Sequence, residues 1–364
     1  MRLALLGAGH IGQTIARLLR DSGDFDITVF DRQALPLDKL RAQGIAVQTL
    51  DTQDPVALGR ALRGRAAVVN ALPYHLAVPV AKAALAAGCH YFDLTEDIAA
   101  TREIRRMAAG AATAFMPQCG LAPGFIAIVA HHLAQSFDTL DEVKLRVGAL
   151  PAFPTNALKN NLTWSVDGLI NEYGHACECV RDGERTEVLP LEGMEHFCLD
   201  GTEYEAFNTS GGLGTLCESM QGRVRNLDYK TVRYPGHRDL MKFLLTDLRL
   251  GSDTDTLKSI LRRAMPATMQ DVVLVFVTVS GQRHGTLVQE VFARKIFADR
   301  ESDAPTSAIQ ITTAAGVCTA VDLFREGRLP RSGFIRQEQI QLPHFLANRF
   351  GRAFQQSRQV QSIG

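Results

Sequence analysis

Short apolar runs alternate with longer segments rich in Ala and Leu over the first 122 residues. The apolar runs, each of a length typical of a β-strand, are Leu3–Leu6, Ile27–Phe30, Val47–Leu50, Ala67–Ala71, Tyr91–Leu94 and Ala114–Met116. The segments with helical spacing between them include Ile11–Leu19, Pro55–Leu62, Val78–Ala87 and Ile104–Ala112. Strands that alternate with helices in this way form βαβ units around a parallel sheet with both faces covered. The pattern therefore predicts an α/β fold with a doubly wound parallel sheet over residues 1–122.

The pattern changes between residues 123 and 304. A helix is predicted over Phe125–Ser136, and alternating strands follow it. Asp-Gly pairs at 182–183 and 200–201 are strong signals for two-residue hairpin turns, and Val272–Ser280 with Thr286–Ile296 form a longer hairpin. This region is predicted to be an α+β domain on a mixed or antiparallel sheet. An apolar helix, Thr306–Phe324, opens the last stretch, residues 305–364.

Composition narrows the functional classes. The chain has 364 residues, enough for two or three domains, and its 39 basic and 39 acidic residues balance. No basic block is present to neutralise a nucleic-acid backbone, and the longest apolar runs reach about half of the ~20 residues of a membrane helix. The seven cysteines are scattered, without zinc-ligand spacing, and we expect no signal peptide before the first strand. We therefore expect a soluble, cytoplasmic protein without a metal, a nucleic-acid partner or a membrane anchor.

A glycine motif lies at the end of the first predicted strand. Gly7, Gly9 and Gly12 enclose His10 and Ile11 in the pattern G-x-G-x-x-G, which then opens a helix. In a βαβ unit the first glycine allows a tight turn, the second lets backbone N–H groups approach a pyrophosphate, and the third lets the helix pack on the strand. The helix N-terminus adds a positive dipole end. The motif predicts a Rossmann-type dinucleotide site.

Acidic and polar residues at the ends of later strands extend this site. Asp31 stands about 20 residues after the motif, where a carboxylate binds the ribose hydroxyls and favours NAD over NADP. Arg32 leaves NADP possible, because a guanidinium there can pair with the 2′-phosphate. Ligands bind beyond the carboxyl ends of such strands, so Asp51 and the Ala71-Leu72-Pro73 loop join the predicted cofactor site.

Further polar residues are candidates for chemistry on a substrate. Tyr74 follows the Ala71–Pro73 loop. Glu96 lies in the stretch 93–97, which has three carboxylates; Asp97 or Thr95 in this stretch has the simpler role of capping the next helix. His237 has an ordinary pKa suited to proton exchange, although a hydrogen-bonded histidine after a Pro-Gly turn is the structural alternative. Arg233 can form a bidentate pair with a carboxylate or, alternatively, a surface ion pair. The polar loop Asn208-Thr209-Ser210 can bind an amino-acid head group.

Several motifs together resemble the saccharopine dehydrogenase family, in the same order from residue 1 to about 325. Besides the glycine motif these are Ala71–Tyr74, Tyr91–Leu94, Gly120–Gly124, Gly148–Pro151, Thr163–Ser165, Glu205–Phe207 and Val232–His237. The resemblance implies a Rossmann domain at 1–122 completed by a returning C-terminal helix within 305–364, a substrate-binding and dimerisation domain at 123–304, and a homodimer.

Within this family the chain looks most like the lysine 6-dehydrogenases, which oxidise the ε-amine of L-lysine with NAD to the semialdehyde. Glutamate-forming saccharopine dehydrogenases commonly carry G-L-D-P-G and C-G-G-L-P at two of these motifs. This chain has Ala122 in place of the aspartate and Val147 in place of the cysteine, so it lacks those two polar side chains. Tyr74 matches the tyrosine of the saccharopine and carboxynorspermidine enzymes. The resemblance implies an NAD(P)-dependent dehydrogenase of an amino acid, with saccharopine dehydrogenase or a carboxynorspermidine synthase-like condensation as alternatives, and a non-enzymatic nucleotide sensor as a third class.

Overall fold

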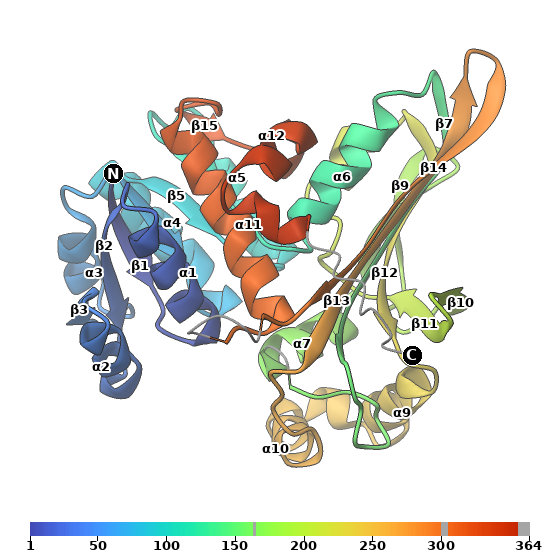
Figure 1. The fold of residues 1–364 in the computed structure, drawn as a ribbon, viewed down its shortest axis with the longest axis horizontal. Coiled ribbons are helices and arrows are strands. Elements are labelled where there is room, and N and C mark those ends of the chain that lie inside the picture. Colours follow the sequence, from blue (N-terminus) through green and yellow to red (C-terminus); the bar gives the residue numbers. More distant parts are fainter. Residues whose placement is uncertain (163–164, 300–304, 356–364) are drawn as a thin grey trace, which may run out of the picture. The chain divides into compact units, whose positions relative to one another are not determined.

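The structure is a computed structural model that describes residues 1–162, 165–299 and 305–355. Thr163 and Trp164, of the motif Thr163–Ser165, lie outside the described residues, as does the polar tail after Gln355. The chain divides into two compact units (Figure 1). Unit 1 consists of Met1–Ile128 and Gln310–Ala353, and unit 2 contains the described residues of Val129–Ile309 with Phe354 and Gln355.

Unit 1 is built on a seven-stranded sheet in which every neighbouring pair is parallel. The strand order is β15-β6-β5-β4-β1-β2-β3, so the chain reverses its direction of winding between β1 and β4. The strands are β1 (Arg2–Leu6), β2 (Asp26–Asp31), β3 (Ala46–Thr49), β4 (Ala67–Asn70), β5 (His90–Asp93), β6 (Ala114–Met116) and β15 (Gly333–Phe334). A sheet of this order binds ligands at the carboxyl ends of the strands beside the reversal, here β1 and β4.

Helices connect these strands, and several start at a side chain that caps them. They are α1 (His10–Asp21), α2 (Ala34–Ala42), α3 (Pro55–Leu62), η1 (Tyr74–Leu76), α4 (Ala77–Ala87) and α5 (Ile98–Ala108), followed near the C-terminus by η4 (Gln337–Gln339), α12 (Leu342–Ala347) and η5 (Gly351–Phe354). The Asp54 carboxylate accepts hydrogen bonds from the first backbone N–H groups of α3, and Asp97 does the same for α5. The expected cap before α5 is therefore confirmed, with Asp97 as the capping residue.

Side chains on both faces of this sheet are buried. Ala4 and Leu6 of β1 belong, with Val68 and Tyr91, to a core that also contains residues of α3, α4 and α5. On β5, Phe92 faces the other way and contacts Phe324 of α11 (Ala308–Arg325), with ring centroids 5.4 Å apart. Alternation of this kind is what a sheet covered on both faces requires.

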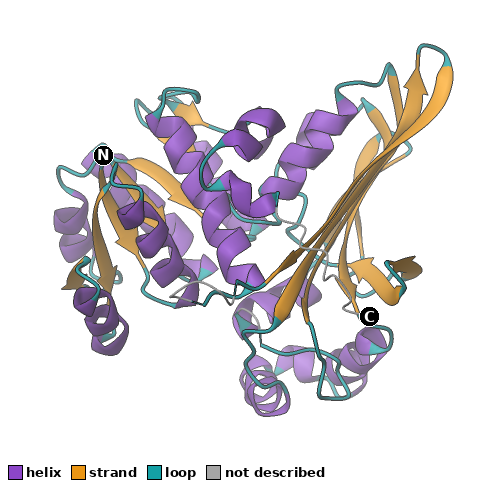
Figure 2. Cartoon of the chain, in the orientation of Figure 1, coloured by secondary structure: helices purple, strands orange, loops and turns teal. Residues whose placement is uncertain are grey.

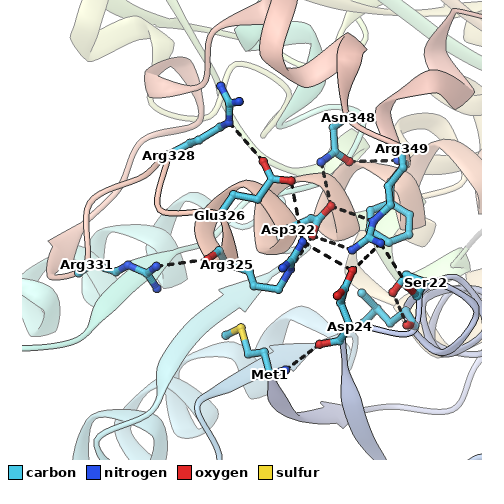
Figure 3. A network of polar contacts seen from close by, with 12 residues as sticks. Met1, Ser22, Asp24, Asp322, Arg325, Glu326, Arg328, Arg331, Asn348 and Arg349 are labelled. Carbon is cyan, nitrogen blue, oxygen red and sulfur yellow. Dashed lines mark hydrogen bonds and ion pairs between the residues drawn. The ribbon is translucent and has the colours of Figure 1, made fainter.

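The C-terminal segment is held to the start of unit 1 by a buried acid. Asp322 of α11, only 1% exposed, accepts hydrogen bonds from Arg325, Asn348 and Arg349 (Figure 3). Burial works to raise the pKa of Asp322, but these donors outweigh it and the pKa is lowered. Arg349 also pairs with Asp24, in the turn between α1 and β2, at 2.7 Å. Residues far apart in sequence are thereby joined within one unit.

Unit 2 is built on an eight-stranded mixed sheet in which β7, β12, β13 and β14 are the long strands (Figure 2). The main path is β10-β11-β12-β7-β13-β14, with β8 paired to β12 and to β9. The strands are β7 (Thr139–Pro151), β8 (Cys177–Arg181), β9 (Glu184–Val188), β10 (Glu195–Leu199), β11 (Thr202–Asn208), β12 (Val224–Arg233), β13 (Asp271–Arg283) and β14 (Thr286–Phe297). β12 and β7 run parallel, whereas the other pairs are antiparallel.

The hairpin turns lie where the sequence predicts them. Asp182-Gly183 joins β8 to β9, and Asp200-Gly201 joins β10 to β11, with positive φ at both residues of each turn. Positive φ at both positions is the backbone of a type I′ turn, which matches the twist of the two strands. The β13–β14 turn is at His284-Gly285, so both strands extend further than predicted.

The helices of unit 2 come from the segments between its strands. They are α7 (Val166–Gly174), α8 (Leu216–Met220), α9 (His237–Lys242), the π-helical turn η2 (Phe243–Asp247), η3 (Leu250–Ser252) and α10 (Thr254–Ala264). The chain enters unit 2 within α6 (Phe125–Ala134) and leaves it within α11. The predicted fold class, a doubly wound parallel sheet followed by a mixed-sheet α+β unit, is confirmed.

Candidate functional site

The loop after β1 is shaped by two glycines that the chain itself requires. Gly7 has φ of +102°, and a Cβ on it would lie 2.8 Å from the carbonyl oxygen of Ala71. A Cβ on Gly12 would lie 2.0 Å from the carbonyl oxygen of Gly7. The β1–α1 turn is therefore packed directly against the loop after β4, and no larger residue fits at either position without displacing backbone.

Gly9 differs from these two glycines, because nothing in the described chain requires it. Its φ of −66° and ψ of −174° suit any residue, and a Cβ there would meet no atom within 4 Å. Gly9 is exposed and precedes α1, whose N-terminus carries no side-chain cap. A group outside the chain that approaches the backbone closely explains a glycine here, and the pyrophosphate of a dinucleotide fits that requirement. His10 and Ile11 form the first turn of this helix.

Asp31 lies at the end of β2 and faces the same loop. Its Oδ2 accepts a hydrogen bond from the backbone N–H of Ala8 at 2.7 Å, and its Oδ1 accepts one from Gln33 at 2.8 Å. The carboxylate is thus fixed beside the glycine loop, while Arg32 is exposed. Asp51, which follows β3, is exposed and accepts a hydrogen bond from the backbone of Gln53 in its own turn.

A buried polar network ties together the ends of β4, β5 and β6. The Tyr91 hydroxyl donates to Asp93 Oδ2 at 2.6 Å, and the other carboxylate oxygen of Asp93 accepts the backbone N–H groups of Thr95 and Gln118. Burial raises the pKa of Asp93 to about 6, although these donors oppose the shift. Asn70, at the end of β4, accepts the N–H of Leu72. The network orders the loops that follow the strands.

Tyr74 and Glu96 lie in the two loops that this network anchors. Tyr74 begins η1 directly after Pro73, and its ring packs edge-on against His75. Glu96 lies between β5 and α5, one residue before the Asp97 cap. Both side chains are partly exposed.

The most deeply buried cation among the predicted site residues is in unit 2. Arg233, the last residue of β12, is 3% exposed. Its Nε donates to the hydroxyl of Tyr173 at 3.1 Å and its Nη1 to the carbonyl of Val232 at 3.0 Å. Burial works to lower the pKa of Arg233, but Tyr173 and Glu172 outweigh it and raise the pKa, so the side chain stays charged. Across residues 1–162, 165–299 and 305–355, no carboxylate forms an ion pair with it.

Tyr173 connects Arg233 to His237. The Tyr173 hydroxyl lies 3.0 Å from His237 Nε2, and His237 Nδ1 lies 2.8 Å from the carbonyl oxygen of Leu158. Burial first, and then the charge of Arg233, lower the pKa of His237 to about 3. His237 is therefore a neutral imidazole near neutral pH, with both ring nitrogens in hydrogen bonds. This environment favours the structural alternative for His237, and its catalytic role stays a prediction.

The position of His237 is set by Glu205 and by aromatic rings. Glu205 of β11 accepts the backbone N–H groups of Gly236 at 2.7 Å and Arg238 at 2.6 Å, which fixes the start of α9. The His237 ring stacks on Phe207, with an interplanar angle of 13°, and meets Tyr173 edge-on. Tyr173 of α7 and Phe207 of β11 thus enclose this imidazole, and the backbone carbonyl of Leu158 lies at its Nδ1.

The three predicted polar residues at the end of β11 and in the loop that follows it have different surroundings. Asn208 donates to the carbonyl of Leu189 and Ser210 to that of Asn171, so both hold neighbouring backbone. Thr209 is 2% exposed, and its Oγ1 has no hydrogen-bond partner in the described chain. A buried hydroxyl without a partner is costly, which makes Thr209 the member of this loop that a ligand would satisfy.

The structure groups the predicted residues into two sets. In unit 1 it brings together the glycine loop, Asp31 and the Ala71–Pro73 loop; in unit 2 it joins Arg233 to His237. Sequence reasoning assigned no role to Tyr173 or Glu205, which make the contacts within the second set. Tyr173 lies in a helix that the sequence pattern did not predict, and neither its spacing nor its neighbours indicate a partner 60 residues away. Only the pairing of distant segments reveals it.

The fold and the glycine loop define a class. Three features are typical of dinucleotide-dependent oxidoreductases. The winding of the parallel sheet reverses between β1 and β4, the space beside Gly9 in the glycine loop is open, and a carboxylate is held at the end of β2. Two family descriptions match the chain: "Saccharopine dehydrogenase NADP binding domain" over residues 3–115 and "Saccharopine dehydrogenase C-terminal domain" over residues 120–350. The protein belongs to the saccharopine dehydrogenase family, and its first unit is an NAD(P)-binding domain.

Solved structures share the fold. The apo saccharopine dehydrogenase (L-Glu forming) from Saccharomyces cerevisiae is 18% identical, with a TM-score of 0.79, and the match covers 94% of this chain and 96% of that one. The homospermidine synthase from Legionella pneumophila, solved with NAD, is 13% identical, with a TM-score of 0.68, over 97% of this chain and 89% of that one. At these identities the likeness concerns the fold.

Two further observations concern only the residues that the structure describes. Within them, no helix is both long enough and apolar enough to cross a membrane. Nor do they contain a group of three or more His, Cys, Asp or Glu side chains arranged to hold a metal ion. The Cys177 and Cys179 side chains are both buried on β8, at alternate positions of one strand.

Proposed function

We propose that this protein is an NAD(P)-dependent dehydrogenase that oxidises a carbon–nitrogen bond of an amino acid, with L-lysine and its ε-amine as the substrate. In this reaction the neutral amine loses a hydride from the adjacent carbon, the nitrogen lone pair forms the C=N bond, and water then replaces ammonia to yield the semialdehyde. A bound NAD(P)⁺ supplies the hydride acceptor.

Arg233 is the observation that carries the proposal. Arg233 is buried and charged, Glu172 favours its charged form, and no carboxylate of the described chain lies within ion-pair distance of it, so its guanidinium can take an anion from outside the chain. The α-carboxylate of an amino acid is an anion of the right geometry, since guanidinium and carboxylate pair through parallel hydrogen bonds. The unpartnered hydroxyl of Thr209 supplies a further donor or acceptor for the head group.

Proton transfer is assigned to Tyr74 and Glu96 in this proposal. Hydride leaves only from a neutral amine, so a group must take or hold the ammonium proton, and another must guide the attacking water. His237 is less suited to this task, because its pKa of about 3 keeps it neutral and its two nitrogens are occupied. Tyr74 and Glu96 are partly exposed and follow β4 and β5 at the carboxyl edge of the sheet, where ligands of such sheets bind.

The cofactor is proposed to be NAD. The Asp31 carboxylate, held beside the glycine loop by Ala8, would accept hydrogen bonds from ribose hydroxyls and repel a 2′-phosphate. Exposed Arg32 is the feature that permits NADP. The substrate is proposed to be smaller than saccharopine because Ala122 and Val147 lack the polar groups that saccharopine dehydrogenases commonly have there.

A substrate panel tests the proposal. L-lysine, L-saccharopine and cadaverine, which is lysine without its carboxylate, are each offered with NAD⁺ and NADP⁺, and formation of the reduced cofactor is followed by absorbance. The expected result is oxidation of L-lysine with NAD⁺ and a much higher KM for cadaverine. Faster oxidation of L-saccharopine, or equal KM values for lysine and cadaverine, would contradict the assignment. Joining of an aldehyde and an amine with the reduced cofactor would instead favour a condensing enzyme.

The assembly and location are proposed from the family resemblance. We infer a cytoplasmic homodimer in which unit 2 provides the contacts between copies. Light scattering of the purified protein tests the assembly, and a monomer at micromolar concentration would contradict it.

A further inference from the structure

The hydrogen bonds around Tyr173 can run in only one direction. A guanidinium donates and never accepts, so the Tyr173 oxygen accepts from Arg233 Nε at 3.1 Å. The carbonyl of Leu158 accepts and never donates, so the proton of His237 lies on Nδ1. His237 Nε2 is then the acceptor, and the Tyr173 hydroxyl donates to it at 3.0 Å. The chain of donors runs from Arg233 through Tyr173 and His237 to Leu158.

This chain determines which edge of Arg233 remains available. Nε is occupied by Tyr173 and Nη1 by the carbonyl of Val232. In the described part of the protein Nη2 makes no hydrogen bond, so its two N–H groups, together with the second N–H of Nη1, remain for an external anion. The orientation of the planar guanidinium is therefore fixed by the Tyr173 hydroxyl on one side and by its own strand on the other.

We infer that Tyr173 is a positioning residue for substrate binding: its hydroxyl holds the guanidinium of Arg233 in the orientation that receives the substrate carboxylate, with neutral His237 as the fixed acceptor behind it. The inference rests on the proposed function for the identity of the anion. Tyr173 acts through Arg233 and does not itself touch the reacting atoms.

The surroundings show why the hydroxyl matters more than the ring. Tyr173 is fully buried at the end of α7, and its ring packs edge-on against Phe207, a contact that phenylalanine would keep. Burial raises the pKa of Tyr173 to about 12, so the hydroxyl keeps its proton and its direction. Removing the oxygen alone would leave Arg233 Nε without an acceptor and His237 Nε2 without a donor. The guanidinium would then be free to turn toward another partner.

The first measurement needs no substrate. Two-dimensional ¹⁵N–¹H spectra of the histidine rings report which nitrogen carries the proton, and His237→Gln identifies the signal. We expect His237 protonated on Nδ1 in the full-length protein. In Tyr173→Phe, the Nε2 shift should move toward that of a nitrogen without a hydrogen bond. A wild-type His237 protonated on Nε2, or an Nε2 shift unchanged in Tyr173→Phe, would overturn the inference.

The second measurement compares substrates with and without a carboxylate. Tyr173→Phe should raise KM for L-lysine at least about tenfold, with a much smaller change in kcat, and leave KM for cadaverine within about twofold. Tyr204→Phe is the matched control, because Tyr204 is buried in the same unit and packs on Tyr234 in a separate core. It should change neither KM, and thermal unfolding checks that both variants fold.

The outcomes separate this inference from the proposed function. If Arg233→Ala leaves KM for L-lysine unchanged, or if the protein oxidises neither L-lysine nor L-saccharopine, the proposed function fails and the spectra alone decide the arrangement of hydrogen bonds. If Arg233→Ala raises KM but Tyr173→Phe does not, the carboxylate site stands and the positioning role of Tyr173 is wrong. Equal increases in KM for lysine and cadaverine would show a general structural effect and would also contradict the positioning role.

Discussion

The two candidate sites are built from different parts of the polypeptide. In unit 1, the glycine loop places backbone atoms: Gly7 and Gly12 are required by carbonyl groups 2.8 and 2.0 Å from where a Cβ would be, and Gly9 leaves open space. In unit 2, side chains from other elements hold Arg233. Its Nε donates to the hydroxyl of Tyr173 in α7, and that hydroxyl lies within hydrogen-bond distance of His237 in α9. A site formed by the backbone of consecutive residues can be recognised from a sequence motif. A site formed by side chains that are far apart in the sequence leaves no such motif.

The same contrast distinguishes how the sites respond to substitution. A backbone site fails when a side chain is added, because the added atoms occupy space that the backbone or a ligand needs. A side-chain site fails when atoms are removed, because a buried charge or polar group loses its partner.

The largest effect is expected from Gly12→Ala. The added Cβ would meet the Gly7 carbonyl, so the β1–α1 turn must move, and we expect a loss of stability of about 3 kcal/mol together with loss of measurable NAD(P) binding. Gly9→Ala is the control, because its Cβ has open space; it should keep the wild-type melting temperature and still weaken NAD(P) binding. Calorimetric titration and thermal unfolding measure both. Wild-type affinity in Gly9→Ala would show that the pyrophosphate does not approach this backbone.

The next effect is expected from Arg233→Ala. It should raise KM for an amino-acid substrate by an amount equivalent to roughly 2–4 kcal/mol and change kcat much less, because the carboxylate loses a desolvated partner. NAD(P) affinity should be unchanged, since the glycine loop belongs to unit 1. Steady-state kinetics with L-lysine provides the measurement, and a fall in kcat with constant KM would place Arg233 in the chemistry instead.

Each unit also contains a buried aspartate whose pKa is raised to about 6 by burial, Asp93 in unit 1 and Asp271 in unit 2. The folded state binds the carboxyl proton of each aspartate more tightly than the unfolded chain, in which the pKa is 3.8. The contribution of each aspartate to the free energy of unfolding therefore falls as the pH rises from about 4 to 6 and is lost above pH 6. The contribution is at most about 3 kcal/mol for each group.

Urea unfolding between pH 4 and 7 tests this for Asp93→Asn and Asp271→Asn separately. In each variant, stability relative to wild type should be lowest at pH 4 and improve toward pH 7, because only the wild type loses the contribution. A relative stability that does not change with pH would show that folding does not shift the pKa of the carboxyl group. Asp271 caps α11 through Ala308 and Ile309, so this variant also reports on that helix start.

The smallest effect is expected from Asp31→Ser. Wild-type protein should bind NAD more tightly than NADP, and the substitution should narrow the gap by about 1–2 kcal/mol, because a carboxylate no longer faces the 2′-phosphate. Calorimetric titration with both cofactors measures the gap. Tighter binding of NADP by the unmodified protein would contradict the assignment of NAD.

Much of the fold could be predicted because it depends on local patterns. Alternating apolar runs and helical segments predicted the parallel sheet, and Asp-Gly pairs predicted two hairpins whose positive φ angles the structure contains. Elements with weak local sequence signals were not predicted. β15 has only two residues, and they form a strand because β6 presents a free edge to them. The mixed sheet of unit 2 was predicted in kind, but its order, with β12 parallel to β7, depends on long-range pairing.

The sequence by itself determined the glycine loop, the acid at Asp31 and the class of fold, because turns, backbone clearance and the apolar period act over a few neighbouring residues. Tertiary structure alone decided that Arg233 is a buried cation oriented by Tyr173 and that His237 is held neutral. The physical reason is that burial and hydrogen-bond direction arise from segments that meet only after folding. The pKa of a histidine depends on the hydration it loses on burial and on the charges that folding brings near it, and the residues adjacent in the sequence determine neither.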